Sequence, residues 1–120
     1  MESIAGRSNR NKLSMSTNVL YIDTSSNEKI IVSLTIDGKE YKKEQKIDHN
    51  KAQVVLPMID AFLKEKKMKL SDIHSIEVHP GPGSFTGVRV GVSIANALSF
   101  ALRIPINGRP LGEFVIPVYD

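Results

Sequence analysis

Hydrophobic and polar positions first alternate along this chain and later recur at a helical period. Between residues 28 and 36 every second position is apolar, which is the period of a β-strand with one buried face. These positions are Ile30, Val32, Leu34 and Ile36. A short apolar segment at 19–23 precedes them, and Asp37-Gly38 follows as a hairpin-turn signal. We therefore expect a strand at 19–23 and a hairpin with strands at 28–36 and 39–47.

The period changes after residue 50. Apolar residues recur at spacings of three and four between 50 and 67, which predicts a helix, and Pro57 favours a start nearer Val54. A second helix is expected at 84–102, directly after a loop rich in glycine and proline. Further strands are expected at 73–79 and 114–119, and residues 104–106 with a turn at Asn107-Gly108 connect the second helix to the last strand.

This order, β-β-β-α-β-α-β, predicts an α/β fold with a mixed sheet and helices packed on it. A chain of 120 residues supports one domain. Residues 1–17 have almost no apolar periodicity and are interpreted as a disordered arm. We expect residues 18–120 to form the single folded lobe.

Composition narrows the function classes. The chain has no cysteine, so disulfide, thiol and cysteine-zinc chemistry are excluded. The net charge is only +3, and the lysines after residue 63 fit a solvated helix end better than a nucleic-acid patch. Arg89 and Asn96 interrupt the longest apolar run, so no membrane association is expected.

The second helix carries small residues four positions apart, which places them in one row. Both helices also have a wider apolar arc than one sheet can cover, which favours an exposed docking surface. The expected surface comprises Val54, Met58, Ala61, Gly87, Gly91, Ile94 and Ala95. The alternative is that the two helices bury these residues against each other.

The glycine-rich loop could cradle a phosphate, but it lacks the lysine of a P-loop and the spacing of a dinucleotide fingerprint. Tight-turn geometry is the other reason for its glycines. Asp23 could hold a metal or orient a water, although a lone carboxylate in a turn is more often a cap. His49, His74 and His79 lack metal-ligand spacing, so no metal site and no complete active site are predicted.

Two motifs resemble the bacterial TsaB family, named for tRNA threonylcarbamoyladenosine biosynthesis. One is Asp23-Thr24-Ser25 at the end of the first strand, and the other is the segment from Gly81 to Gly91. Residues 53–59 resemble that family's first helix. The motif positions carried over are Asp23, Gly81, Gly83, Ser84, Thr86, Gly87 and Arg89.

The resemblance implies an actin-like (ribonuclease H-like) lobe in the cytoplasm. It implies a non-catalytic partner of the TsaD enzyme, which transfers a threonylcarbamoyl group to the adenosine beside the tRNA anticodon. The complex would hold ATP and further subunits, while this chain alone binds no cofactor and touches tRNA only indirectly. TsaB-type proteins pair through their first-lobe helices with TsaD or with a second copy. Family members normally have a second lobe, which we expect to be absent here, and Lys51 stands where the family frequently has histidine.

Two hypotheses from other classes stay open at this point. One is an ATP-binding or phosphotransfer protein that uses Asp23 and the glycine-rich loop. The other is a homodimeric interaction module unrelated to tRNA. Binding of Mg-ATP by the isolated chain would favour the phosphotransfer hypothesis. Co-purification with a TsaD homologue would favour the TsaB-like subunit over the homodimeric module.

Overall fold

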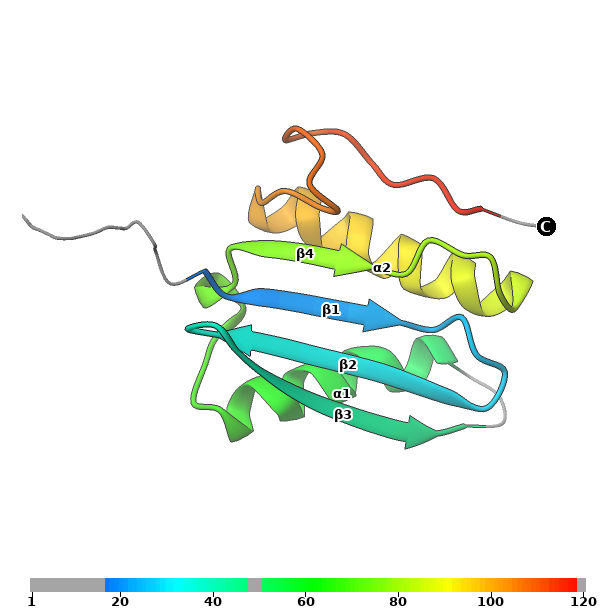
Figure 1. The fold of residues 1–120 in the computed structure, drawn as a ribbon, viewed down its shortest axis with the longest axis horizontal. Coiled ribbons are helices and arrows are strands. Elements are labelled where there is room, and N and C mark those ends of the chain that lie inside the picture. The colour runs from blue at the N-terminus through cyan, green and yellow to red at the C-terminus, as the bar shows by residue number, and fades with distance from the viewer. Residues whose placement is uncertain (1–16, 48–50, 119–120) are drawn as a thin grey trace, which may run out of the picture.

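Over the residues that the structure describes, the fold is one four-stranded mixed sheet with two long helices on one face (Figure 1). The computed structural model describes residues 17–47 and 51–118. The strands are β1 (Val19–Asp23), β2 (Lys29–Ile36), β3 (Lys39–Lys46) and β4 (Ser75–Val78), in the order β3-β2-β1-β4. β2 is antiparallel to both of its neighbours, and β1 is parallel to β4. The expected disordered arm falls almost entirely on residues 1–16, outside the described residues.

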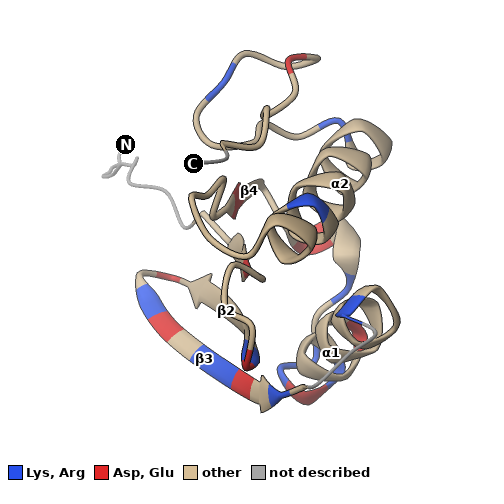
Figure 2. Ribbon diagram, turned by 90° about the vertical axis from the view of Figure 1, so that its right-hand side faces the viewer, with Lys and Arg blue, Asp and Glu red and all other residues tan. Residues whose placement is uncertain are grey.

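The two long helices are α1 (Lys51–Glu65) and α2 (Phe85–Leu102), and η2 (Leu70–Asp72) is a short 3₁₀ helix before β4. Both long helices cover the same face of the sheet (Figure 2). Pro57 lies inside α1, so the expectation that it delays the helix start to Val54 is wrong. The loss of one backbone donor is tolerated because Gln53 and Pro57 are exposed, where water can solvate the unpaired carbonyl.

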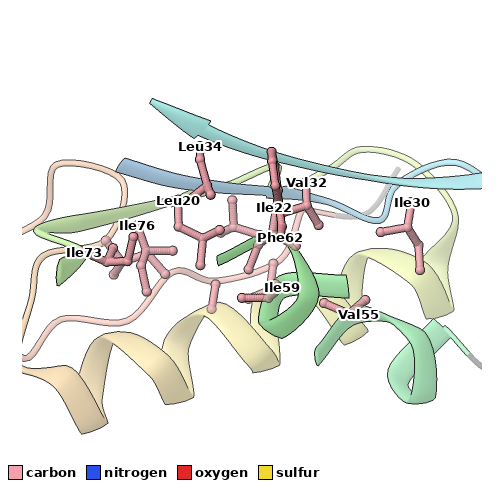
Figure 3. Packing of buried hydrophobic residues seen from close by; sticks show 14 of the residues in the cluster. Leu20, Ile22, Ile30, Val32, Leu34, Val55, Ile59, Phe62, Ile73 and Ile76 are labelled. Atoms are coloured by element: carbon pink, nitrogen blue, oxygen red, sulfur yellow. The ribbon is translucent and has the colours of Figure 1, made fainter. Parts of the chain in front are cut away.

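The core lies between the sheet and the helices (Figure 3). Ile30, Val32 and Leu34 point into it, which confirms the alternation read from the sequence. β1 contributes Leu20 and Ile22, both fully buried. The helices contribute a fully or nearly fully buried set comprising Val55, Ile59, Phe62, Leu63, Val88, Val92 and Ala95.

The β2–β3 hairpin forms as predicted, because Asp37 and Gly38 both adopt positive φ angles of 53° and 81°. Two such residues make the tight turn whose twist matches that of the strands. β3 is largely exposed and is one of the two outer strands of the sheet among the described residues.

The expected final strand does not form over its described residues 114–118, and one bridge at Ile106 extends the sheet instead. Ile106 pairs with Ile76 in parallel, but Pro105 has no N–H and Asn107 turns away at φ 49°. Residues 114–118 form no strand, because their main partner is a side chain on α2: the Asn96 amide exchanges two hydrogen bonds with Val115. Tyr119 lies outside the described residues.

α2 is long and apolar enough to cross a membrane by length and composition alone, contrary to the expectation that Arg89 and Asn96 disqualify it. In the fold, one of its faces packs on the sheet and contributes Val88, Val92 and Ala95 to the core. The core helix of a soluble protein passes the same test of length and composition, so the test alone does not make α2 a membrane span.

Candidate functional site

The turn after β1 and the glycine-rich loop before α2 pack directly on each other. The backbone N–H of Ser84 donates to the carbonyl oxygen of Ser25 at 2.8 Å. A Cβ added to Gly83 would lie 2.7 Å from the Ser25 Cβ. Only a glycine permits this approach, so the motif glycine serves contact between two loops of the same chain.

Thr24 fills the next part of this contact. It is 1 % exposed, and its hydroxyl donates to the Gly87 carbonyl oxygen. A Cβ on Gly91 would collide with the Thr24 hydroxyl, and one on Gly87 would collide with the Thr24 carbonyl oxygen. The row of small residues on α2 therefore packs against Thr24 of the same chain.

Asp23 acts within its own turn. Its Oδ1 accepts hydrogen bonds from the Ser25 backbone N–H at 2.9 Å and from the Ser25 hydroxyl at 2.6 Å. This is the capping role that the sequence offered as the alternative to metal or water binding. The Tyr21 hydroxyl lies 3.5 Å from Asp23 Oδ2, and burial together with that carboxylate raises the pKa of Tyr21.

Lys51 is a residue of this site that sequence reasoning did not place. Its Nζ donates to the carbonyl oxygens of Thr24, at 3.1 Å, and of Ser26, which ties α1 to the turn after β1. Burial lowers the pKa of Lys51, and the nearby Asp23 acts in the opposite direction. In the sequence, the only sign of this role was that Lys51 stands where the family frequently has histidine, and that difference did not indicate which groups Lys51 contacts.

The remaining motif residues are structural or exposed. Ser84 caps α2, and its Oγ accepts the Gly87 N–H at 3.3 Å. Gly81 has φ 101° and lies against the Val118 carbonyl. Thr86 and Arg89 are exposed, with the Arg89 guanidinium 5.5 Å from the centre of the Phe85 ring.

No group of three metal-ligating side chains exists among the described residues. His74 Nδ1 accepts the Asn18 N–H at 2.9 Å, and His79 Nδ1 accepts the Gly81 N–H at 3.1 Å. His74 thus joins the residue before β4 to the residue before β1, and His79 supports the loop that follows it. His49 lies outside the described residues.

The predicted docking surface divides into three places. Gly87, Gly91 and Ala95 are buried, so their assignment to an exposed surface is wrong. The reason is that the small-residue row faces the sheet and Thr24.

The other four residues line two separate grooves. Val54, Met58 and Ala61 line a groove of about 480 Å³ between α1 and β3, together with Lys43 and Glu65. Ile94 lies in a groove of about 440 Å³ between α1 and α2, whose other lining residues are Ala52, Thr86, Arg89, Val90 and Ser93. We name the second groove the interhelical groove.

The lysines near the end of α1 are engaged locally. Lys64 pairs with Asp60 at 3.0 Å, and Lys66 lies 3.8 Å from the centre of the Tyr41 ring. These contacts fit the solvated-terminus interpretation.

Comparison with known proteins identifies the family. The family model for TsaD, tRNA N6-adenosine threonylcarbamoyltransferase, matches residues 41–108. TsaB of Buchnera aphidicola (subspecies Schizaphis graminum) is 38 % identical over 102 residues, covering 78 % of this chain and 44 % of that protein. TsaB of Bacillus subtilis is 32 % identical over 113 residues, covering 85 % and 49 %.

A solved structure, YeaZ from Pseudomonas aeruginosa, superposes with a TM-score of 0.71 at 36 % identity, covering 75 % of this chain and 42 % of that one. The predicted actin-like lobe is thereby confirmed. This chain spans less than half the length of these relatives. It belongs to the TsaD-like superfamily, as a TsaB-type protein.

Proposed function

We propose that this chain is a non-catalytic subunit in the synthesis of tRNA threonylcarbamoyladenosine, and that it binds a TsaD-type transferase through the interhelical groove. The observation that carries this proposal is that the residues of the family motif make structural contacts within the chain. Gly83 and Gly87 contact other parts of the chain, and Asp23 caps the turn that they contact, so the motif supports the position of α1 and α2. We infer the reaction from the relatives, which are named for this biosynthesis.

The interhelical groove suits a partner helix. Val90 and Ile94 are half-buried in it, and Ser93 is a small exposed residue on the same side of α2. Ser93, Ala97 and Ala101 are exposed and four positions apart, so a second row of small residues lies on the outside of α2. A helix can approach closely along such a row while its apolar side chains cover Val90 and Ile94.

The other components follow from this assignment. In the proposed complex the reaction, the ATP and the contact with tRNA belong to the partner and further subunits, and the complex works in the cytoplasm. The isolated chain should then give no calorimetric signal with Mg-ATP. Saturable binding would favour the phosphotransfer alternative.

The deciding experiment is co-purification with a TsaD homologue. Ile94→Asp places a charge in the interhelical groove and should reduce the amount of captured TsaD by at least tenfold, because a desolvated charge opposes association. Leu111→Asp is the matched control, since Leu111 is 64 % exposed and lies outside this groove. Equal capture by the wild type and Ile94→Asp, with both folded by circular dichroism, would place the partner elsewhere.

A further inference from the structure

β3 has an unpaired edge among the described strands. The geometry of the hairpin determines which residues of β3 direct their backbone N–H and C=O groups toward that edge. The two-residue turn makes Ile36 and Lys39 a hydrogen-bonded pair, and Ile47 N–H still donates to Glu28 O at 2.9 Å at the other end. Odd-numbered residues of β3 therefore bond toward β2. The backbone N–H and C=O groups of the even-numbered residues point away from the sheet.

Those even-numbered residues alternate in charge. They are Glu40, Lys42, Glu44 and Lys46, and Figure 2 shows red and blue bands along this strand. Their side chains share the face of the sheet opposite the helices, because they pair with Thr35, Ser33, Ile31 and Lys29. Lysines on an edge usually oppose pairing with other strands, whereas alternating signs oppose only misaligned pairing.

We propose that β3 pairs antiparallel with β3 of a second copy of this chain, with Lys43 on the two-fold axis. In this register Glu40 is opposite Lys46 of the partner subunit, and Lys42 is opposite Glu44 of the partner subunit. The symmetry repeats both pairs, so four opposite-charge pairs form. All four lie at positions whose backbone groups are free to form the new ladder.

Neighbouring registers are worse for definite reasons. A shift of two residues one way places Glu40 opposite Glu44 and Lys42 opposite itself. A shift of two the other way places Lys42 opposite Lys46 and Glu44 opposite itself. A shift of one residue brings even positions opposite odd ones, whose backbone groups already bond to β2.

The groove between α1 and β3 supports the same contact. It runs along the inner side of this edge and is lined by Val54, Met58 and Ala61. A paired β3 would direct its own inner side chains toward this groove. The two Lys43 side chains would meet near the axis, but each has a carboxylate, since Lys43 Nζ lies 2.9 Å from Glu65.

Cysteine cross-linking tests the register. The chain has no cysteine, so Lys43→Cys introduces a single thiol. Opposed residues at a non-hydrogen-bonded site of an antiparallel pair have Cα atoms about 4.5 Å apart, within disulfide range. Under mild oxidation Lys43→Cys should form a covalent dimer, whereas Gln45→Cys, which would oppose Tyr41 of the partner subunit, should remain monomeric. Equal cross-linking of both variants, or none of Lys43→Cys, would overturn the proposal.

Charge exchange tests the cause. Lys42→Glu/Lys46→Glu makes the row fully acidic, and Glu40→Lys/Glu44→Lys makes it fully basic. With Lys43→Cys added, each charge variant alone should lose the covalent dimer, and the mixture of the two should recover it. A Lys43→Cys cross-link that survives both double substitutions would show that the charge row does not set the pairing and would overturn the proposal. The Ile94→Asp capture experiment reports on the transferase independently, so the two proposals fail separately.

Discussion

The side-chain hydroxyl of Thr24 donates a hydrogen bond to the backbone carbonyl of Gly87, 63 positions further along the chain. This bond joins the turn after β1 to the first turn of α2. Lys51 reaches the same turn from α1 and donates to the Thr24 carbonyl. One nearly fully buried threonine thus connects the first strand to both helices, and the glycines around it allow the approach.

Gly91→Ala should therefore destabilise the monomer. Its Cβ would collide with the Thr24 hydroxyl, and over-packing at a well-packed site costs about 1–3 kcal/mol. Urea unfolding measures the change in the free energy of unfolding. Ser93→Ala, on the exposed side of the same helix, should change it by less than about 0.5 kcal/mol.

A double-mutant cycle shows whether the collision is the cause. Thr24→Ala removes the obstructing hydroxyl, so Gly91→Ala should cost much less in that background than in the wild type. Had the row been exposed, as the sequence suggested, Gly91→Ala would leave the unfolding midpoint unchanged and affect only association. That result would contradict the packing described here.

The direction of the glycine row shows the limit of periodicity. Spacing established that Gly87, Gly91 and Ala95 share one helix face, and they do. It could not establish which element that face contacts, because Thr24 is distant in sequence. Alternation in β2 was sufficient to place Ile30, Val32 and Leu34 in the core, since each side chain of a strand has only two directions, but it did not indicate that Ser33 is buried as well.

Tyr21 should make stability fall at alkaline pH. Burial and Asp23 raise the pKa of Tyr21, so the folded chain keeps this proton after the unfolded chain has lost it. Above about pH 10, deprotonation of Tyr21 stabilises the unfolded state relative to the folded state. The contribution of Tyr21 to the free energy of unfolding is therefore lost as the pH rises through its folded pKa. The free energy of unfolding of the wild type should fall relative to that of Tyr21→Phe over this range.

Paired urea titrations at pH 8, 9, 10 and 11 measure that difference. The pKa of Lys51 is lowered by burial, so its contribution has the opposite sign, but Lys51 is present in both proteins and its effect largely cancels. A difference that stays constant across the series would show that Tyr21 titrates alike in the folded and unfolded chains.

The chain after α2 was the least predictable part of the fold. Apolar residues at 114–119 indicated a last strand, yet the described residues 114–118 form none, and a bridge that was not predicted forms at Ile106. A side-chain amide bonds to the backbone in each place: Asn107 bonds Val78, and Asn96 bonds Val115. Single asparagines leave no periodic signal, so the sequence pattern could not distinguish these arrangements from a sheet.

Asn96→Ala should release residues 113–118 from α2. The substitution removes both hydrogen bonds to Val115, whose side chain is only 4 % exposed, and should cost about 1–3 kcal/mol. Hydrogen exchange at the Val115 amide should accelerate strongly, while the amides of β1 keep most of their protection. Gln53→Ala removes an exposed amide from α1 and provides the control. Unchanged Val115 exchange in Asn96→Ala would mean that side-chain packing, including the Phe100–Phe114 edge contact at 6.4 Å, holds this segment without the asparagine.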